Sequence, residues 1–146
     1  LMYDRILIAT DGSELAEKAV DQGLAMAKAV GAKVIVVRVT SMPAPMVYEG
    51  VVVALPTEEI RAEIAARVAE HFAVLKSKAT ALGVDMETVH VEHDQPWQAI
   101  IDTAKQKAAN LIVMASHGRR GISAVLLGSE TQKVLTHTTI PVLVCR

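Results

Sequence analysis

The sequence predicts an α/β domain, a doubly wound three-layer sandwich around a five-stranded parallel sheet. Short apolar, β-branched runs alternate along the chain with longer amphipathic patterns, and such alternation indicates parallel strands joined by right-handed crossovers, with helices on both faces. The chain has 146 residues, which predicts one domain, assigned to residues 2–146. Hydrophobic residues make up 51% of the chain but aromatic residues only 3%, so we expect an aliphatic core.

The first third of the chain predicts a strand, a helix and a second strand. Arg5–Thr10 is a buried strand that ends at a turn signal. Ser13 is a suitable helix N-cap, and Gly31 suits the end of that helix. The β-branched run Lys33–Val39 predicts the second strand.

A proline-containing segment, Thr40–Pro56, is predicted to be a loop. A strand over Val51–Leu55 is the less favoured alternative. The segment is apolar for a loop, and both a lid and a partner surface remain open as its role. A long helix, Thr57–Leu82, follows it, capped by Thr57 and closed by Gly83.

The second half of the chain predicts three more strands and two helices. In order, they are an outer strand over Val84–Val91, a helix opened by Asp94 and Pro96, a buried strand over Asn110–Ala115, a helix capped by Ser129 that runs to about His137, and a final strand over Pro141–Cys145.

Glycines concentrate in Met114–Ser129, between a strand end and a helix start. Glycine lets backbone N–H groups approach an anion, and a helix N-terminus offers free donors and a positive dipole end. These features predict a phosphate-binding loop, although ordinary turn and cap glycines are the alternative. The segment matches neither a Walker A loop nor a dinucleotide fingerprint. Its glycines are Gly118, Gly121 and Gly128, and its cationic residues are Arg119 and Arg120.

Nearly the whole chain resembles the universal stress protein family. The similarity lies in the opening YDRILIATDGSELAEKAV, the second strand ending in Val39, the segment ASHGRRGISAVLLGSETQKVL and the closing IPVLVCR. The family's ATP-binding subgroup carries Gly-x2-Gly-x9-Gly-Ser/Thr, which falls here on positions 115 to 129. Two residues depart from the family's pattern. Ala115 replaces the first glycine, and Glu130 stands where a small apolar residue is usual.

The resemblance implies a fold like that of adenine nucleotide alpha-hydrolases, with strand order 3-2-1-4-5, and a dimer that binds ATP, ADP or AMP. It places Ala9, Thr10 and Asp11 at the adenosine end, Val39 at the adenine edge through its backbone, and Met114 and Ala115 beside the ribose and phosphates. The implied phosphate-holding residues are His117, Gly118, Arg119, Gly128, Ser129, Glu130 and Thr131.

Three other functions compete with a nucleotide-binding stress or signalling module. A slow ATPase or self-phosphorylating enzyme would need a base, for which His117 and Asp11 are the candidates near the site. A nucleotide-free dimeric scaffold draws its support from Ala115 and Glu130. The acidic cluster and phosphoacceptor of a receiver domain are not assembled. Mg²⁺ or Mn²⁺ would suit the phosphates.

Composition bears on partners and location. Fifteen basic against sixteen acidic residues argue against nucleic-acid binding, and the apolar runs are too short to span a membrane. With Cys145 as the lone cysteine and no visible leader pattern, we expect a cytoplasmic protein. The apolar strand Ile140–Cys145 has no helix after it, which predicts a homodimer through that strand.

A few side chains have both a functional and an ordinary interpretation. Asp11 suits a ribose, a divalent ion or an Asx-turn, with ligand contact favoured. The pair His90 and His93 is expected on a solvated surface rather than on a metal, because no third ligand is evident. Other expectations are surface or cap positions for His71 and His137, a core position for Trp97 and a packing role for Cys145.

Overall fold

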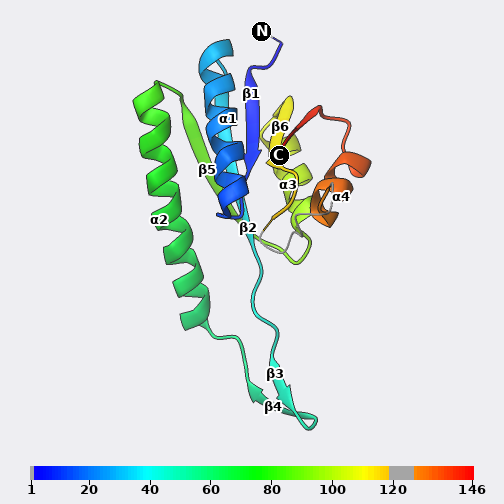
Figure 1. Ribbon diagram of the computed structural model, residues 1–146. Helices are drawn as coiled ribbons and strands as arrows, with labels where there is room; N and C mark the ends of the chain where they lie inside the picture. Colours follow the sequence, from blue (N-terminus) through cyan, green and yellow to red (C-terminus); the bar gives the residue numbers. More distant parts are fainter. Residues whose placement is uncertain (1, 119–126) are drawn as a thin grey trace.

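A computed structural model describes residues 2–118 and 127–146 and confirms the doubly wound sheet (Figure 1). The parallel sheet has the order β5-β2-β1-β6-β7, which is 3-2-1-4-5 when its five strands are numbered along the chain. The elements are β1 (Arg5–Ala9), α1 (Glu14–Val30), β2 (Lys33–Thr40), β3 (Met46–Tyr48), β4 (Val51–Ala54), α2 (Glu58–Leu82), β5 (Met86–Glu92), α3 (Pro96–Gln106), β6 (Leu111–Ala115), α4 (Ser129–His137) and β7 (Val142–Cys145).

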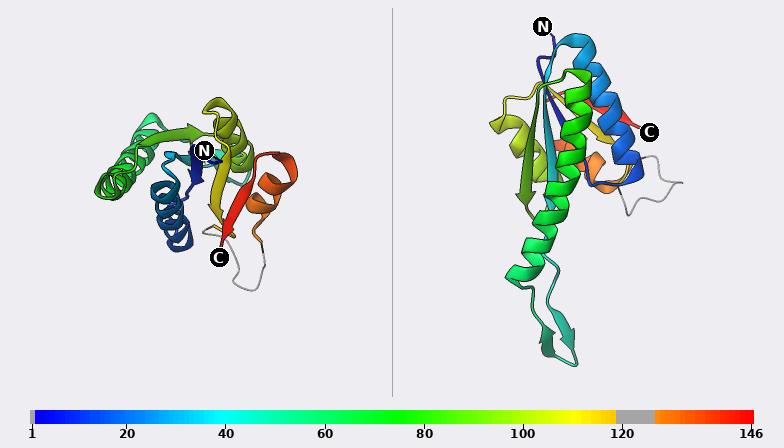
Figure 2. Two further views of the ribbon diagram at one scale, coloured as in Figure 1. Left: turned by 90° about the horizontal axis from the view of Figure 1, so that it is seen from above. Right: turned by 90° about the vertical axis from the view of Figure 1, so that its left-hand side faces the viewer.

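Helices cover both faces of the sheet (Figure 2), α1 and α2 on one and α3 and α4 on the other. On one face, Ile8 of β1 packs with Leu24 of α1 and Leu75 of α2. On the other, Leu7 packs with Ile101 of α3 and Val134 of α4. Successive residues of the central strand therefore point into two aliphatic cores, as expected for a strand buried on both faces. No helix within residues 2–118 and 127–146 is both long and apolar enough to cross a membrane.

Most of the predicted helix ends are confirmed. Ser13 Oγ accepts from the N–H of Ala16 at 3.3 Å, and Gly31 ends α1 in the left-handed region at φ 73°. Thr57 caps α2 in the same way. For the last helix the predicted cap is wrong by one residue. Gly128 occupies the extended N-cap position, and Ser129 is the first helical residue.

The prediction of a loop over Thr40–Pro56 is also wrong, because most of this segment is an antiparallel hairpin. β3 and β4 pair through Val47 with Val52 and Tyr48 with Val51. The two residues between the strands, Glu49 and Gly50, both have positive φ, at 48° and 78°. This conformation matches the right-handed twist of a two-residue hairpin. The hairpin projects away from the sheet, beside the start of α2 (Figure 1).

His71 is not the surface residue that the sequence predicts. Its side chain is only 16% exposed and lies between α1, α2 and β2. His71 Nε2 lies 2.5 Å from Glu17 Oε1, and Nδ1 lies 2.8 Å from Arg38 Nη1. The histidine therefore links the two helices of one layer to the strand beneath them.

The expectations for His137, Trp97 and Cys145 are confirmed. His137 is exposed, and its Nδ1 bonds the carbonyl of Lys133. Trp97 packs against the α3–α4 core, and its ring is tilted by 30° to the His137 ring, with 4.5 Å between centroids. Cys145 is buried in the core, and this burial raises the pKa of its thiol.

Candidate binding cleft at the carboxyl ends of the strands

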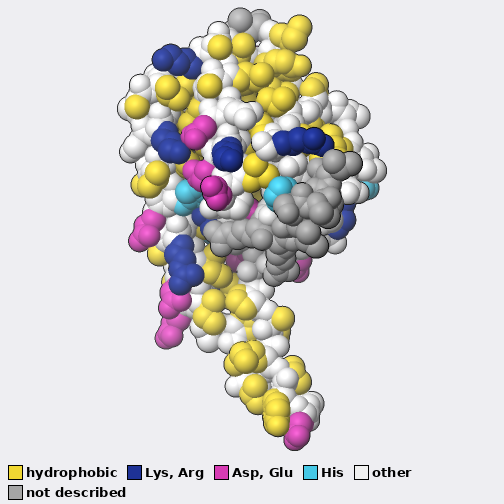
Figure 3. Space-filling view, viewed as in Figure 1, with side chains coloured by type: hydrophobic (Ala, Val, Ile, Leu, Met, Phe, Trp, Pro, Cys, Tyr) yellow, Lys and Arg dark blue, Asp and Glu magenta, His cyan; other side chains and the backbone are white. Residues whose placement is uncertain are grey.

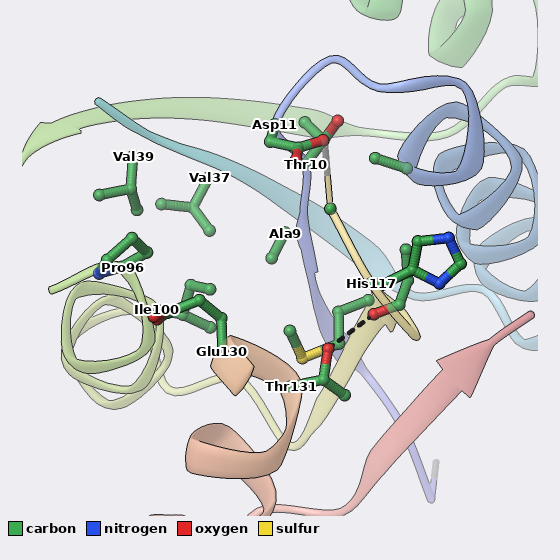
Figure 4. A pocket seen from close by; sticks show the side chains of 14 residues that line it. Ala9, Thr10, Asp11, Val37, Val39, Pro96, Ile100, His117, Glu130 and Thr131 are labelled. Atoms are coloured by element: carbon green, nitrogen blue, oxygen red, sulfur yellow. Dashed lines mark hydrogen bonds between the residues drawn. The ribbon is translucent and has the colours of Figure 1, made fainter. Parts of the chain in front are cut away.

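A cleft opens beyond the carboxyl ends of β1, β2 and β6, where the strand order reverses (Figure 4). Ligands of open α/β sheets bind at such switch points. An inner part of about 180 Å³ meets an outer part of about 480 Å³ at shared walls that include Asp11, His117 and Gly118. Together the two parts fall in the range of small-molecule sites, about 300–1,000 Å³.

The cleft brings together every predicted site residue that the structure describes. Those in the inner part are Ala9, Thr10, Asp11, Val39, Met114, Ala115, His117, Gly118, Glu130 and Thr131, and the outer part adds Gly128 and Ser129. Arg119 was also predicted here and lies outside the described residues, as do Arg120 and Gly121.

Six further residues line the cleft that sequence reasoning did not select. Val37 lies two residues before Val39 on the same face of β2, a signal that strand periodicity could have supplied. Pro96 and Ile100 reach the cleft from α3, whose docking on this face no local pattern reveals. The complete list of added residues is Ala16, Val37, Ser41, Asp94, Pro96 and Ile100.

The turn after β1 is held by side-chain bonds to its own backbone. Asp11 Oδ1 accepts from the N–H of Ser13 at 2.9 Å, and Thr10 Oγ1 accepts from the N–H of Gly12 at 3.1 Å. Asp11 therefore forms the Asx-turn that the sequence allows, while its carboxylate also lines the cleft. A Cβ at Gly118 would lie 2.5 Å from Asp11 Oδ2, so only glycine fits this position without displacing the carboxylate.

The start of α4 is fixed to the end of β6 by two hydrogen bonds. The N–H of Gly128 donates to the carbonyl of Ser116 at 2.7 Å. Thr131 Oγ1 donates to the carbonyl of Ala115 at 2.9 Å (Figure 4). A Cβ on Gly128 would lie 3.1 Å from His117 Cα, tighter than most real contacts. Small residues here thus let the helix N-terminus approach the strand end and border the outer cleft.

Glu130, which departs from the family pattern, has a structural role in the fold. Its Oε2 accepts from the N–H of Trp97, in the first turn of α3, at 2.8 Å. Gln95, the N-cap residue of α3, makes no side-chain cap bond, so the carboxylate supplies the acceptor from a different helix. Lys133 Nζ lies 3.7 Å from the other oxygen. The charge is therefore partly balanced, although Glu130 still borders both parts of the cleft.

The remaining histidines bind neighbouring polar groups rather than one another. His90 Nε2 lies 2.7 Å from Thr40 Oγ1, and His93 Nδ1 accepts from the N–H of Gln95 at 2.8 Å. Burial, followed by the charge of Arg38, lowers the pKa of His90. Across the described part of the chain, no group of three or more His, Cys, Asp or Glu residues is arranged to hold a metal ion.

Comparison with known proteins assigns the chain to a family. The model of the universal stress protein family matches residues 2–146. The universal stress protein YxiE of Bacillus subtilis is 33% identical over 155 residues, covering 99% of this chain and all of the relative.

Two solved structures are similar in fold. The protein MJ0577 aligns with a TM-score of 0.82 and 25% identity, covering 99% of this chain and 96% of that one. A universal stress protein in complex with cAMP aligns with a TM-score of 0.68 and 27% identity, covering 99% and 97%. The family match over residues 2–146 and the whole-length relative agree, and the chain belongs to the universal stress protein family.

Proposed function

We propose that the protein binds ATP in the cleft and acts as a stress or signalling module whose conformation or partner choice depends on the bound nucleotide. One observation carries the proposal. Gly118, Gly128 and Ser129, which match the nucleotide-binding pattern of the family, converge on the outer cleft at the start of α4.

The inner cleft suits an adenine base. Its walls are largely aliphatic, from Ala9, Val37, Val39, Ile100 and Met114. In the described part of the cleft, the wall holds no aromatic ring besides the imidazole of His117, so apolar contact rather than stacking between rings would hold the base. Backbone groups of β2 near Val39 would read its edge, and Asp11 would accept from a ribose hydroxyl.

The outer cleft suits phosphates. The first N–H groups of α4 have no acceptor within the helix, and the N-cap residue Gly128 has no side chain to cap them. Asp11, Asp94 and Glu130 also line this part, so a triphosphate needs compensating positive charge. A Mg²⁺ or Mn²⁺ ion carried by the phosphates would supply it, with Asp11 as a candidate ligand. We therefore expect ATP to bind more tightly with Mg²⁺ than with a chelator.

A relative supports the ligand class. The universal stress protein solved with cAMP binds an adenine nucleotide, and it shares 27% of its residues with this chain over nearly the full length of both. Cyclic AMP has one phosphate, so competition between ATP, ADP, AMP and cAMP distinguishes the preferred ligand of this chain.

Two measurements test the proposal. Denaturing the purified protein and separating the supernatant by ion exchange would release carried-over nucleotide, and calorimetry would measure ATP binding directly. Gly128→Glu should abolish binding, because it places a carboxylate and its bulk at the close contact with His117. As a control, Gln98→Glu adds the same charge at an exposed position of α3 that does not line the cleft. This variant should bind ATP like the wild type. Absence of both carried-over nucleotide and calorimetric binding would exclude the proposal.

We also propose a homodimer through Ile140–Cys145, which contains the edge strand β7. The carbonyls of Pro141 and Cys145 accept from β6, so the backbone of the alternate residues Val142 and Val144 faces the open edge. Val144→Pro removes an outward N–H and leaves these inward bonds in place. It should abolish this association in light scattering with little change in melting temperature. A wild-type chain that shows no association through β7 would contradict the dimer.

A further inference from the structure

The β3–β4 hairpin is an apolar arm on the surface of an otherwise well-covered domain. Its large hydrophobic side chains are 52–67% exposed, and they gather along the projecting arm in Figure 3. They are Met46, Val47, Tyr48, Val51, Val52, Val53 and Leu55.

Both faces of the hairpin are apolar. Val47 and Val52 lie directly opposite each other and share one face, and the neighbouring pair Tyr48 and Val51 lies on the other. A two-stranded hairpin is marginally stable alone in water. An arm of this kind therefore gains most of its stability from packing against another surface.

The size of the exposed area exceeds what a monomer usually presents. At these exposed fractions the seven side chains offer roughly 100 Å² each, or about 700 Å² of apolar surface. The largest patch on a typical monomer is about 300–600 Å², whereas a stable interface buries about 800 Å² on each partner. Because these side chains lie on both faces of the hairpin, the arm nearly supplies one side of a standard interface only where a partner covers both faces.

The charges around the arm decide which partner fits. Between Thr40 and Thr57 the only charged residue is Glu49, at the tip, and Glu58 and Glu59 follow at the start of α2. An anionic membrane surface attracts apolar segments flanked by Lys and Arg. Here Glu58 and Glu59 come first after the arm, and the next cationic residue, Arg61, is paired with Glu58 and Glu92. Apart from Glu49 at its tip, the arm carries no charge that a partner would have to match. Such a surface is instead complementary to a copy of itself, as a twofold interface requires.

We infer that the hairpin is an association arm that packs against the hairpin of a second copy of this chain. This interface lies apart from the proposed β7 contact, since the hairpin and β7 belong to different sheets. A chain that uses both contacts forms assemblies larger than a dimer, and loss of either contact leaves the other intact.

The test uses the full-length chain carrying Val144→Pro, so that β7 pairing cannot contribute. Light scattering over the micromolar range should give twice the 15.6 kDa monomer mass. Adding Val47→Lys with Val52→Glu keeps a favourable cross-strand pair within the hairpin but buries charge at the inferred contact. It should weaken association at least about a hundredfold. The control adds Val74→Lys with Leu135→Glu, two exposed apolar residues elsewhere, and should remain dimeric.

The inference would be overturned if the Val144→Pro chain is monomeric at the highest concentration. It would also be overturned if that chain stays dimeric with Val47→Lys and Val52→Glu added. Binding of the arm to liposomes or to a different protein by a monomeric chain would have the same consequence. A second measurement needs no variant, because amide exchange across β3 and β4 of the wild-type chain should slow as protein concentration rises. Exchange that is independent of concentration would also count against the arm.

Discussion

The contact between Gly118 and Asp11 gives a quantitative prediction for Gly118→Ala. The added Cβ would lie 2.5 Å from Asp11 Oδ2, so the carboxylate must move. That movement breaks the bond between Asp11 Oδ1 and the N–H of Ser13, at a cost of about 1.5 kcal/mol because the acceptor is charged. Alanine also restricts the unfolded chain relative to glycine, which offsets about 0.5 kcal/mol. We expect a net loss of about 1 kcal/mol, or roughly 3 °C in melting temperature.

A double-mutant cycle isolates the steric cause. In an Asp11→Ala background the Cβ at position 118 meets no carboxylate, so Gly118→Ala should stabilise the chain by about 0.5 kcal/mol. The sign of its effect therefore reverses between the two backgrounds, with a coupling energy of about 1.5 kcal/mol. Urea denaturation of the four chains measures this directly. If Gly118→Ala costs the same in both backgrounds, the contact with Asp11 is not the reason that position 118 is glycine.

Three further predictions concern single residues. Glu130→Ala should lower the free energy of unfolding in urea by about 1 kcal/mol, because it leaves the N–H of Trp97 without its acceptor. Glu130→Gln keeps an acceptor, so it should lose less stability and bind ATP more tightly. Equal stability of the two variants would contradict the cap. The pKa of His90 lies below its ordinary value of 6.5, so the unfolded chain takes up the proton first as the pH falls. The free energy of unfolding should therefore fall as the pH drops through 6.5. This pH dependence should vanish in His90→Gln, and its persistence there would disprove the prediction. Gly50→Ala should speed amide exchange in β3 and β4 severalfold because φ is 78° there, and unchanged exchange would show that the turn tolerates a side chain.

The fold was predictable from the sequence because its signals are local. Strands buried on both faces, such as β1 and β6, appear as continuous apolar runs. The helix ends are marked by the capping residues Ser13, Gly31 and Thr57. The hairpin was missed because its turn is Glu49–Gly50 rather than the usual Asn-Gly or Asp-Gly, and because its residues lack the polar alternation of a half-buried strand.

The lining of the cleft was predictable where local sequence patterns mark it. The strand ends and the glycine pattern placed residues from β1, β2, β6 and α4 in one cleft. The contributions of Pro96 and Ile100, and the bond from Glu130 to the N–H of Trp97, depend on how α3 docks beside α4. The partners of His71 likewise come from two other elements, so no local pattern carried them.

The bond from Gly128 to Ser116 has a consequence for how the chain tolerates change. Ser116 and Gly128 flank residues 117 to 127 in the sequence, and the carbonyl oxygen of Ser116 lies 2.7 Å from the backbone nitrogen of Gly128. Closing a longer loop between the same ends costs only about 0.6 kcal/mol for each doubling of its length. Insertions or deletions between these anchors therefore need not disturb the sheet, and ligand preference can diverge through this one segment while the folded domain keeps its stability.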